Sequence, residues 1–450
     1  MTKKEFIDLL FEKGRLAGIE DMEVFVQRNS ELELMVFKGE IDKFSKAEEE
    51  GLSFRGIYRG KMGYSYTEKI DETSLNILIE ELISNAKVID SEDIEEMFEG
   101  AESYREVNVY DESFQNISTE EKISFIKALE KEAFNSDPRV TAVDYCLFGE
   151  NTINSIMKNT KGLDIEDKAN VAYGYISAIV KEGEDVKNGA RYVVSNNFAD
   201  FNPKKLANEA VKEAVSMLGA KSVKSDNYPI ILRNNAAASL LEAFAPIFSA
   251  EQVQKNLSLL KDKLNETIAN DNITLIDDPF MKKGVASKSF DGEGVATKYK
   301  KIIENGVLNT YLHNMKTAKK DGVESTGNAY KASYKSSIEI APTNMYIEEG
   351  DTSLEELIST TNNGILIIEL QGLHSGLDII SGDFSLSAYG YLIKNGEINR
   401  PVNQITVAGN YYDMLKNIEE VGSDIKFNLP GYGYIGSPSL KIKELSVSGE

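Results

Sequence analysis

Four side chains that could perform chemistry lie close together in the C-terminal half: His374, Ser375, Asp378 and Asp383. The histidine and aspartates could bind a metal ion together with His313, the other histidine of the chain. A serine beside a histidine also suggests a nucleophile. Adjacent residues on an extended chain point in opposite directions, however, so His374 would activate Ser375 poorly. We therefore expect a glycine-rich loop, Leu373–Ser385, whose polar groups line a substrate cavity or fix the loop.

Two other polar stretches suggest sites without defining one. Residues 290–299, "FDGEGVATKY", contain acidic residues and glycines but lack the alternating oxygen ligands and distal glutamate of an EF-hand, so a tight turn is expected. Ser325 and Thr326 could lie near a ligand or simply in a loop that leaves a helix. The motifs H-E-x-x-H, G-x-x-x-x-G-K-[ST] and G-x-S-x-G are absent from the sequence.

The elements around these residues are mostly strands. Asn305-Gly306 and Asn395-Gly396 predict two β-hairpins, because both central residues of a type I′ turn need positive φ. A helix is predicted over 235–248. Tyr389 and Tyr391 alternate like one face of a strand, whereas the glycine-aromatic run 431–436 predicts a mobile surface loop.

The N-terminal half alternates between helical and strand patterns. Helices are predicted at 3–17 and 72–88, after the capping-box pair Ser118 and Glu121, and after Pro203. Short strands are predicted at 22–28, 31–39, 51–60, 61–68, 139–149, 151–159, 170–183 and 187–195. This pattern predicts an α+β fold. Its N-terminal domain (1–220) is an antiparallel sheet with helices; a polar linker (219–229) leads to a mostly β C-terminal domain (228–450) with a few helices.

Composition limits the classes of function. The chain has 450 residues, a net charge of −23 and a pI of about 4.7, which disfavours a nucleic-acid partner. No apolar run approaches the roughly 20 residues of a membrane span, and the charged first residues differ from a secretion signal. Cys146 is the single cysteine, so no intrachain disulfide can form. We expect a cytoplasmic protein with neither nucleic-acid nor membrane partners.

Three long stretches carry a family resemblance. Residues 290–328 resemble the C-terminal region of the TldD/PmbA proteins, also called the modulator of DNA gyrase family. Residues 373–425 resemble the characteristic stretch of its PmbA (TldE) branch, and the ending "GSPSLKIKELSVSG" also fits. The resemblance is dense from about Tyr228 onward.

This resemblance implies an intracellular protease that acts on peptides and small, poorly folded proteins. In the family, a TldD-type subunit holds zinc through H-E-x-x-x-H on a helix and a cysteine near the C-terminus, with the glutamate as general base. PmbA-type subunits lack these ligands and pair with a TldD-type partner. The resemblance further implies an N-terminal α+β domain and a largely β C-terminal domain.

An ungapped comparison transfers the zinc helix onto "LEAFAP", residues 241–246. Leu241 and Pro246 occupy the two histidine positions, and only Glu242 persists. The cysteine position falls within 429–439, which contains no cysteine. We therefore expect no catalytic residue, metal or cofactor in this chain, and zinc in a TldD-type partner. Pro246 should also disturb a continuing helix.

Three hypotheses follow. The first is a PmbA/TldE subunit that contributes substrate chamber and assembly, dimerises with a TldD-type subunit or with itself, and binds peptides or unfolded proteins. The second is an independent hydrolase or peptidase with an unusual site around His374, Ser375, Asp378 and Asp383. The third is a regulatory protein that binds gyrase, although the acidic charge argues against direct DNA binding.

Overall fold

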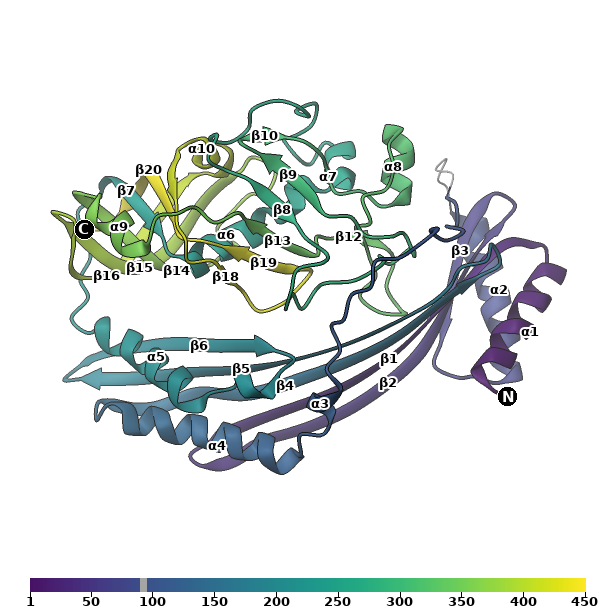
Figure 1. The fold of residues 1–450 in the computed structure, drawn as a ribbon, viewed down its shortest axis with the longest axis horizontal. Helices are drawn as coiled ribbons and strands as arrows, with labels where there is room; N and C mark the ends of the chain where they lie inside the picture. The colour runs from purple at the N-terminus through teal and green to yellow at the C-terminus, as the bar shows by residue number, and fades with distance from the viewer. Residues whose placement is uncertain (90–94) are drawn as a thin grey trace.

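A long, curved antiparallel sheet forms most of the N-terminal half and passes beneath the C-terminal half (Figure 1). The computed structural model describes residues 1–89 and 95–450. The strand order of the sheet is β3-β2-β1-β4-β5-β6. Its strands are β1 (Ile19–Phe37), β2 (Glu40–Tyr58), β3 (Lys61–Thr67), β4 (Val140–Asn159), β5 (Asp164–Glu182) and β6 (Asp185–Ser195).

The prediction of many short strands was wrong for this sheet. β1 and β4 each join two predicted strands into one, because pairing continues through the polar residues between them. Asn29, for example, pairs with Glu49 of β2 and Ile153 of β4. Gly149 does not mark a turn either, because it lies inside β4. The Tyr173 ring covers it so closely that a Cβ at this position would lie 2.3 Å from the ring. Glycine is therefore needed at 149 for a close approach.

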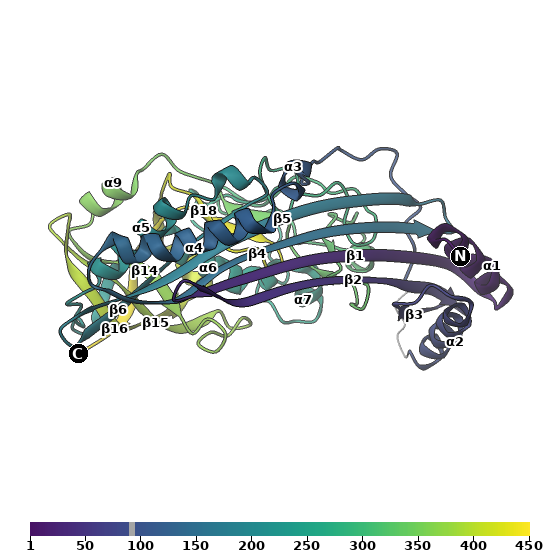
Figure 2. The same cartoon turned by 90° about the horizontal axis from the view of Figure 1, so that it is seen from below.

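Two pairs of helices pack against opposite ends of the sheet and build separate hydrophobic clusters (Figure 2). The pairs are α1 (Lys3–Leu16) with α2 (Glu72–Val88), and α4 (Thr119–Ser136) with α5 (Pro203–Ser216). All four helices predicted for the N-terminal half are confirmed, and Ser118 with Glu121 forms the predicted capping box. No helix in the described parts of the chain is long and apolar enough to cross a membrane.

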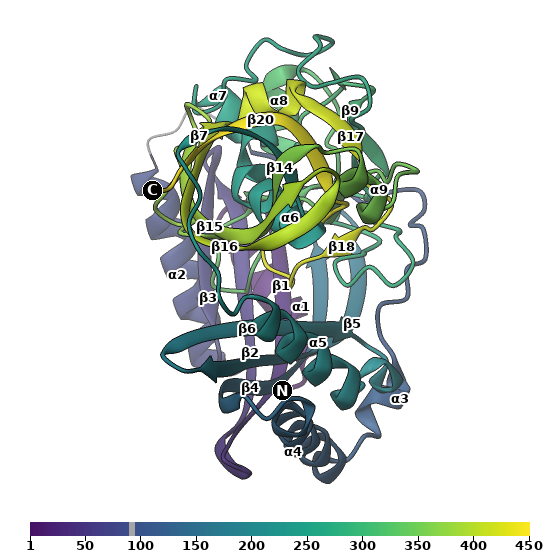
Figure 3. The same ribbon diagram turned by 90° about the vertical axis from the view of Figure 1, so that its left-hand side faces the viewer.

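The C-terminal half contains a sheet that closes on itself. Its order is β16-β15-β14-β7-β20-β17, and β16 also pairs with β20, so five strands form a ring around α6 (Figure 3). These elements are β7 (Asp226–Leu232), α6 (Asn234–Phe244), β14 (Asn363–Gln371), β15 (Asp383–Lys394), β16 (Glu397–Asn410), β17 (Ile418–Val421) and β20 (Leu440–Ser448). β7 thus begins inside the segment predicted as a linker.

A second six-stranded sheet, of order β10-β9-β8-β13-β19-β18, packs beside this ring. Its strands are β8 (Leu275–Asp277), β9 (Lys300–Glu304), β10 (Val307–Leu308), β13 (Asn344–Ile347), β18 (Lys426–Phe427) and β19 (Tyr434–Ser437). The remaining elements are a two-stranded sheet of β11 (Ala329–Tyr330) and β12 (Glu339–Ile340), α3 (Glu112–Gln115), η1 (Phe198–Asp200), η2 (Ala245–Phe248), α7 (Ala250–Gln254), α8 (Met315–Asp321), α9 (Leu354–Ser359) and α10 (Tyr411–Lys416).

The α+β class and both predicted hairpin turns are confirmed. Asn305 and Gly306 have φ of 48° and 80°, and Asn395 and Gly396 have 53° and 76°. The predicted mobile loop 431–436 was wrong in its second half, since Tyr434 begins β19, which pairs with β13 and β18. The Phe427 ring packs over Gly436 there.

The carboxylate of Asp277, at the end of β8, is buried and connects several segments around the second sheet through hydrogen bonds and an ion pair. It accepts hydrogen bonds from the Thr343 backbone N–H (2.7 Å) and hydroxyl (2.6 Å), and from Asn328 Nδ2 (2.8 Å). Lys300 Nζ lies 2.8 Å from its second oxygen and balances its charge. Asp277 therefore fixes both ends of the segment 328–343, which carries β11 and β12.

Replacing Asp277 with alanine should lower the free energy of unfolding by about 3–5 kcal/mol, because it leaves the buried Lys300 ammonium without its partner. Denaturant unfolding followed by circular dichroism would measure this change. Glu324→Ala is the matched control, since it removes the partner of Lys298 in an exposed pair and should barely shift the transition. Equal shifts in both variants would contradict the role of Asp277.

Candidate functional site

The helix α6 is held in place by its apolar face, formed by alanines, leucines and Phe244. Ala236, Ala237, Leu240 and Leu241 are buried inside the ring of strands, where small side chains allow close packing. Leu241 is 2% exposed and belongs to this core. The α-helix ends at Phe244, and the short 3₁₀ turn η2 contains Pro246, as expected of a residue that cannot continue the helix.

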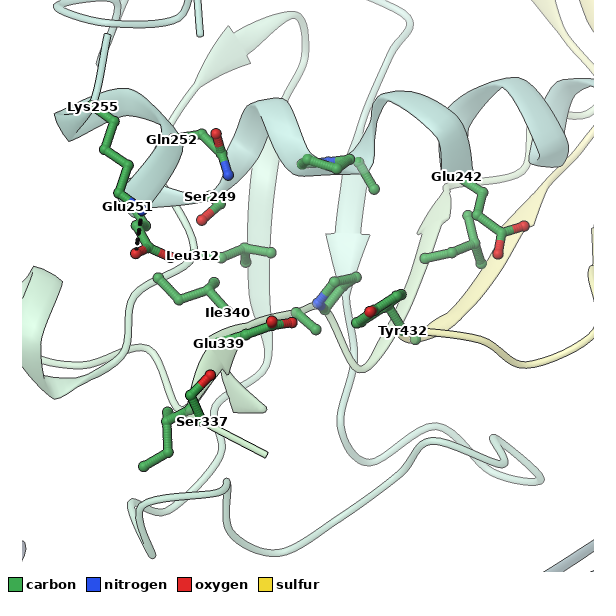
Figure 4. A pocket seen from close by; sticks show the side chains of 17 residues that line it. Glu242, Ser249, Glu251, Gln252, Lys255, Leu312, Ser337, Glu339, Ile340 and Tyr432 are labelled. Atoms are coloured by element: carbon green, nitrogen blue, oxygen red, sulfur yellow. Dashed lines mark hydrogen bonds and ion pairs between the residues drawn. The ribbon is translucent and has the colours of Figure 1, made fainter. Parts of the chain in front are cut away.

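A cavity of about 530 Å³, here called the α6 cavity, opens at the end of this helix (Figure 4). The α6–α7 segment forms one side, and β12 with Tyr432 lies opposite. Its volume falls within the roughly 300–1,000 Å³ of small-ligand sites. The lining residues are Glu242, Ala245, Pro246, Ser249, Glu251, Gln252, Lys255, Leu312, Ser337, Ile338, Glu339, Ile340, Ala341, Pro342, Tyr432, Gly433 and Ile435.

Glu242 is the polar side chain that α6 presents to this cavity. Its Oε2 accepts a hydrogen bond from Asn428 Nδ2 at 3.0 Å. Burial raises the pKa of the Glu242 carboxyl, and the Asn428 bond opposes that rise. A Cβ placed on Gly431 would lie 3.3 Å from Oε1, so the loop passes close to the second oxygen.

The residues at this position do not fit a zinc ion. Leu241 and Pro246 carry no side-chain lone pair, and Leu241 points into the core instead of the cavity. Across residues 1–89 and 95–450, no three His, Cys, Asp or Glu side chains gather as a metal site. Glu242 can therefore act here as a hydrogen-bonding carboxylate.

The short strand β12 lies along the same cavity. β12 pairs with β11 in a two-stranded sheet, so within the described chain its other side has no strand partner. Residues 337–342 line the cavity. An extended peptide can add to such an edge through main-chain hydrogen bonds, which recognise the backbone irrespective of sequence.

The polar stretch before β15 lies elsewhere. His374 and Ser375 are exposed in a turn, and neither they nor Asp378 and Asp383 line the α6 cavity. Asp378 Oδ1 accepts from the Ile380 and Ser381 backbone N–H groups. Asp383 accepts from the Ser381 hydroxyl and from Asn410 Nδ2. These aspartates fix the loop, and β15 begins at Asp383, earlier than the predicted loop end.

Ser325 and Thr326 also hold a loop together outside the α6 cavity. Both hydroxyls donate to the His313 carbonyl, and Thr326 Oγ1 accepts from the His313 backbone N–H at 2.7 Å. His313 is buried, and burial lowers the pKa of its imidazole. Asp291 Oδ1 accepts from the Glu293 and Val295 backbone N–H groups, which confirms a tight turn within 290–299.

Asn428 and Glu339 of this site were not expected from sequence, whereas Tyr432 lies in the segment "PGYGYIG", whose tyrosines could be expected to line a groove. Asn428 follows β18, Glu339 begins β12, and Tyr432 is 68% exposed in the loop before β19. The sequence pattern that could have identified β12 is the short alternation in "SSIEI".

Comparison with known proteins agrees with this architecture. Models of the PmbA/TldA metallopeptidase family match residues 22–86 (domain 1), 112–218 (central domain) and 225–449 (C-terminal domain). A metalloprotease PmbA homolog of Buchnera aphidicola is 30% identical over 321 residues, 71% of this chain and 68% of that protein.

Two solved structures share the whole fold. A putative modulator of DNA gyrase from Thermotoga maritima has a TM-score of 0.92 and 36% identity, covering 99% of this chain and 100% of that one. TldE from Thermococcus kodakarensis has a TM-score of 0.90 and 25% identity, with the same coverage. The resemblance found in the sequence is thereby confirmed, and the chain belongs to the PmbA/TldE metallopeptidase family.

Proposed function

We propose that this chain is the non-catalytic PmbA/TldE-type subunit of a cytoplasmic, two-subunit zinc protease for peptides and poorly folded small proteins. One observation carries the proposal: the degenerate zinc helix still opens onto a ligand-sized cavity, but of residues 241–246 only Glu242, Ala245 and Pro246 line it, and none of the three replaces a lost zinc ligand. The chain therefore retains the α6 cavity but lacks the side chains that would bind zinc. A TldD-type partner would supply the zinc ion.

In this proposal the chain binds and orients the substrate. A peptide in extended form adds to the free edge of β12, where main-chain hydrogen bonds tolerate any sequence. Tyr432 offers an aromatic face beside that edge, and Glu242 accepts hydrogen bonds from the peptide. Extended binding presents the scissile bond to the partner's metal and explains a preference for unstructured substrates.

The two alternative functions gain less support. The independent hydrolase depended on His374 and Ser375, which are exposed in a turn away from the α6 cavity. A gyrase-binding role is suggested by the name of the Thermotoga maritima structure, but no feature of the α6 cavity favours it.

The isolated chain should leave an unstructured peptide uncleaved in the presence of zinc, whereas a mixture with its TldD-type subunit should cleave it. In that mixture Glu242→Gln should keep kcat within about twofold, because a carboxylate without a metal activates no water. Glu339→Gln, another carboxylate of the cavity, is the matched control. Zinc-dependent cleavage by the isolated chain that falls about 100-fold in Glu242→Gln would refute the proposal.

Tyr432→Ala should raise the KM of the reconstituted protease about fivefold or more with little change in kcat, because it removes an aromatic contact from the substrate chamber. Tyr145→Ala serves as the control, since Tyr145 is also an exposed tyrosine (52%) but lies on β4 outside the cavity. Steady-state kinetics on one fluorogenic peptide would compare them. A similar KM in both variants would exclude Tyr432 from substrate binding.

A further inference from the structure

A smaller cavity of about 260 Å³, here called the interdomain cavity, lies between the N-terminal sheet and the C-terminal half. Strands β1, β4 and β5 form one wall, and the segments 285–292 and 330–332 form the other. It shares Pro342, Tyr432 and Gly433 with the α6 cavity, so the two spaces adjoin at these residues. Its volume suits one end of a longer ligand.

Two lysines with no ion-pair partner within 4.0 Å among the described residues line this cavity. Lys331 Nζ donates to Ser53 Oγ at 2.7 Å and lies 4.7 Å from the Phe25 ring centroid and 5.1 Å from that of Tyr64. Lys288 Nζ lies 5.8 Å from the ring centroid of Tyr330. An ammonium group has three donors, so both lysines retain donors for a ligand.

The acidic groups of the cavity are largely committed to the backbone. Asp291 Oδ1 accepts from the Glu293 and Val295 N–H groups, and its Oδ2 accepts from that of Ala329. Asp167 Oδ1 accepts from the Lys168 N–H. The acceptors are thus largely satisfied while ammonium donors remain, which favours an anionic ligand.

We propose that Lys288 and Lys331 bind a carboxylate of the peptide whose main chain lies along β12 in the α6 cavity. The inference rests on the proposed function and adds a substrate class: peptides that place a free C-terminus, or an acidic side chain, in the interdomain cavity. The α6 cavity carries Glu242, Glu251 and Glu339 against Lys255, whereas Lys288 and Lys331 offset Asp167 and Asp291 in the interdomain cavity, which is therefore the less acidic of the two. This difference in charge sets the direction in which the peptide lies.

Isothermal titration of the full chain with three acetylated peptides of alanine, serine and valine tests this inference. One peptide ends in a free carboxylate, the second in an amide, and the third in an amide with one internal aspartate. The free acid should bind about tenfold more tightly than the plain amide, because only the acid forms charge-assisted bonds with the lysines. The third peptide distinguishes a side-chain carboxylate from the C-terminus.

Lys288→Gln and Lys331→Gln should each bring the acid-to-amide ratio close to one. Lys282→Gln is the matched control, because Lys282 lies just before the segment 285–292 but is exposed and lines neither cavity. Unchanged circular dichroism and Tm would show that the variants fold. Equal binding of acid and amide, an unchanged ratio in both variants, or no binding of any peptide overturns the inference. The cleavage assay with the reconstituted protease tests the proposed function independently of these binding measurements.

Binding of the acid peptide should strengthen as the pH falls from about 8 to about 6. Burial, reinforced by the nearby Arg55 and opposed by Glu23, lowers the pKa of Lys331 to about 7, so its ammonium form is gained over this range. Lys288 faces Asp291, Asp167 and Asp277, and burial lowers its pKa as well.

Burial raises the pKa of Asp291 to about 6, so its protonation acts in the same direction. The peptide α-carboxylate stays ionised, with a pKa of about 3.3–3.7. Titrations at both pH values should show a larger gain for the acid than for the amide. A gain that is equal for the two peptides would contradict a role for the lysine charges.

Discussion

The buried carboxylate of Asp277 is the constraint on which both cavities depend. A buried charge is tolerated only when its hydrogen bonds and its counter-charge are complete, and here Lys300, Asn328 and Thr343 complete them. Asn328 and Thr343 lie at the two ends of one long excursion of the chain, the segment 328–343. That excursion carries β12, which lines the α6 cavity, and Lys331, which lines the interdomain cavity.

The N-terminal sheet supports this excursion from the other side. The Tyr64 hydroxyl bonds with the carbonyls of Tyr334 and Ser336, and Lys331 reaches Ser53 of β2. Far along the sheet, the Tyr192 hydroxyl donates to the carbonyl of Phe427, beside the Asn428 that contacts Glu242. Because its strands are uninterrupted, one sheet contacts the C-terminal half at both points, which several short strands joined by turns could not do.

Local chemistry was predictable from sequence, and long-range assembly was not. Helix caps and Asn-Gly turns depend on neighbouring residues, so Ser118 and Asn395 could be interpreted directly. The continuity of β1 through Asn29 depends on partners in β2 and β4, which no local pattern contains. The α6 cavity joins residues near 242, 339 and 432, and a single sequence offers no signal that these positions meet. The absence of zinc donors at Leu241 and Pro246 could be read from the family resemblance, but the cavity beside Glu242 could not.

The ring around α6 has a consequence for the order in which the chain can fold. β7 pairs with both β14 and β20, so the ring unites residues near 230 with residues near 445. During synthesis the N-terminal sheet is complete long before β20 leaves the ribosome. Until then the ring of strands cannot close, and the apolar face of α6 stays exposed. The chain would therefore pass through a stage in which the apolar face of α6 is exposed, and this stage ends only when β20, the final strand, pairs with β7 and β16.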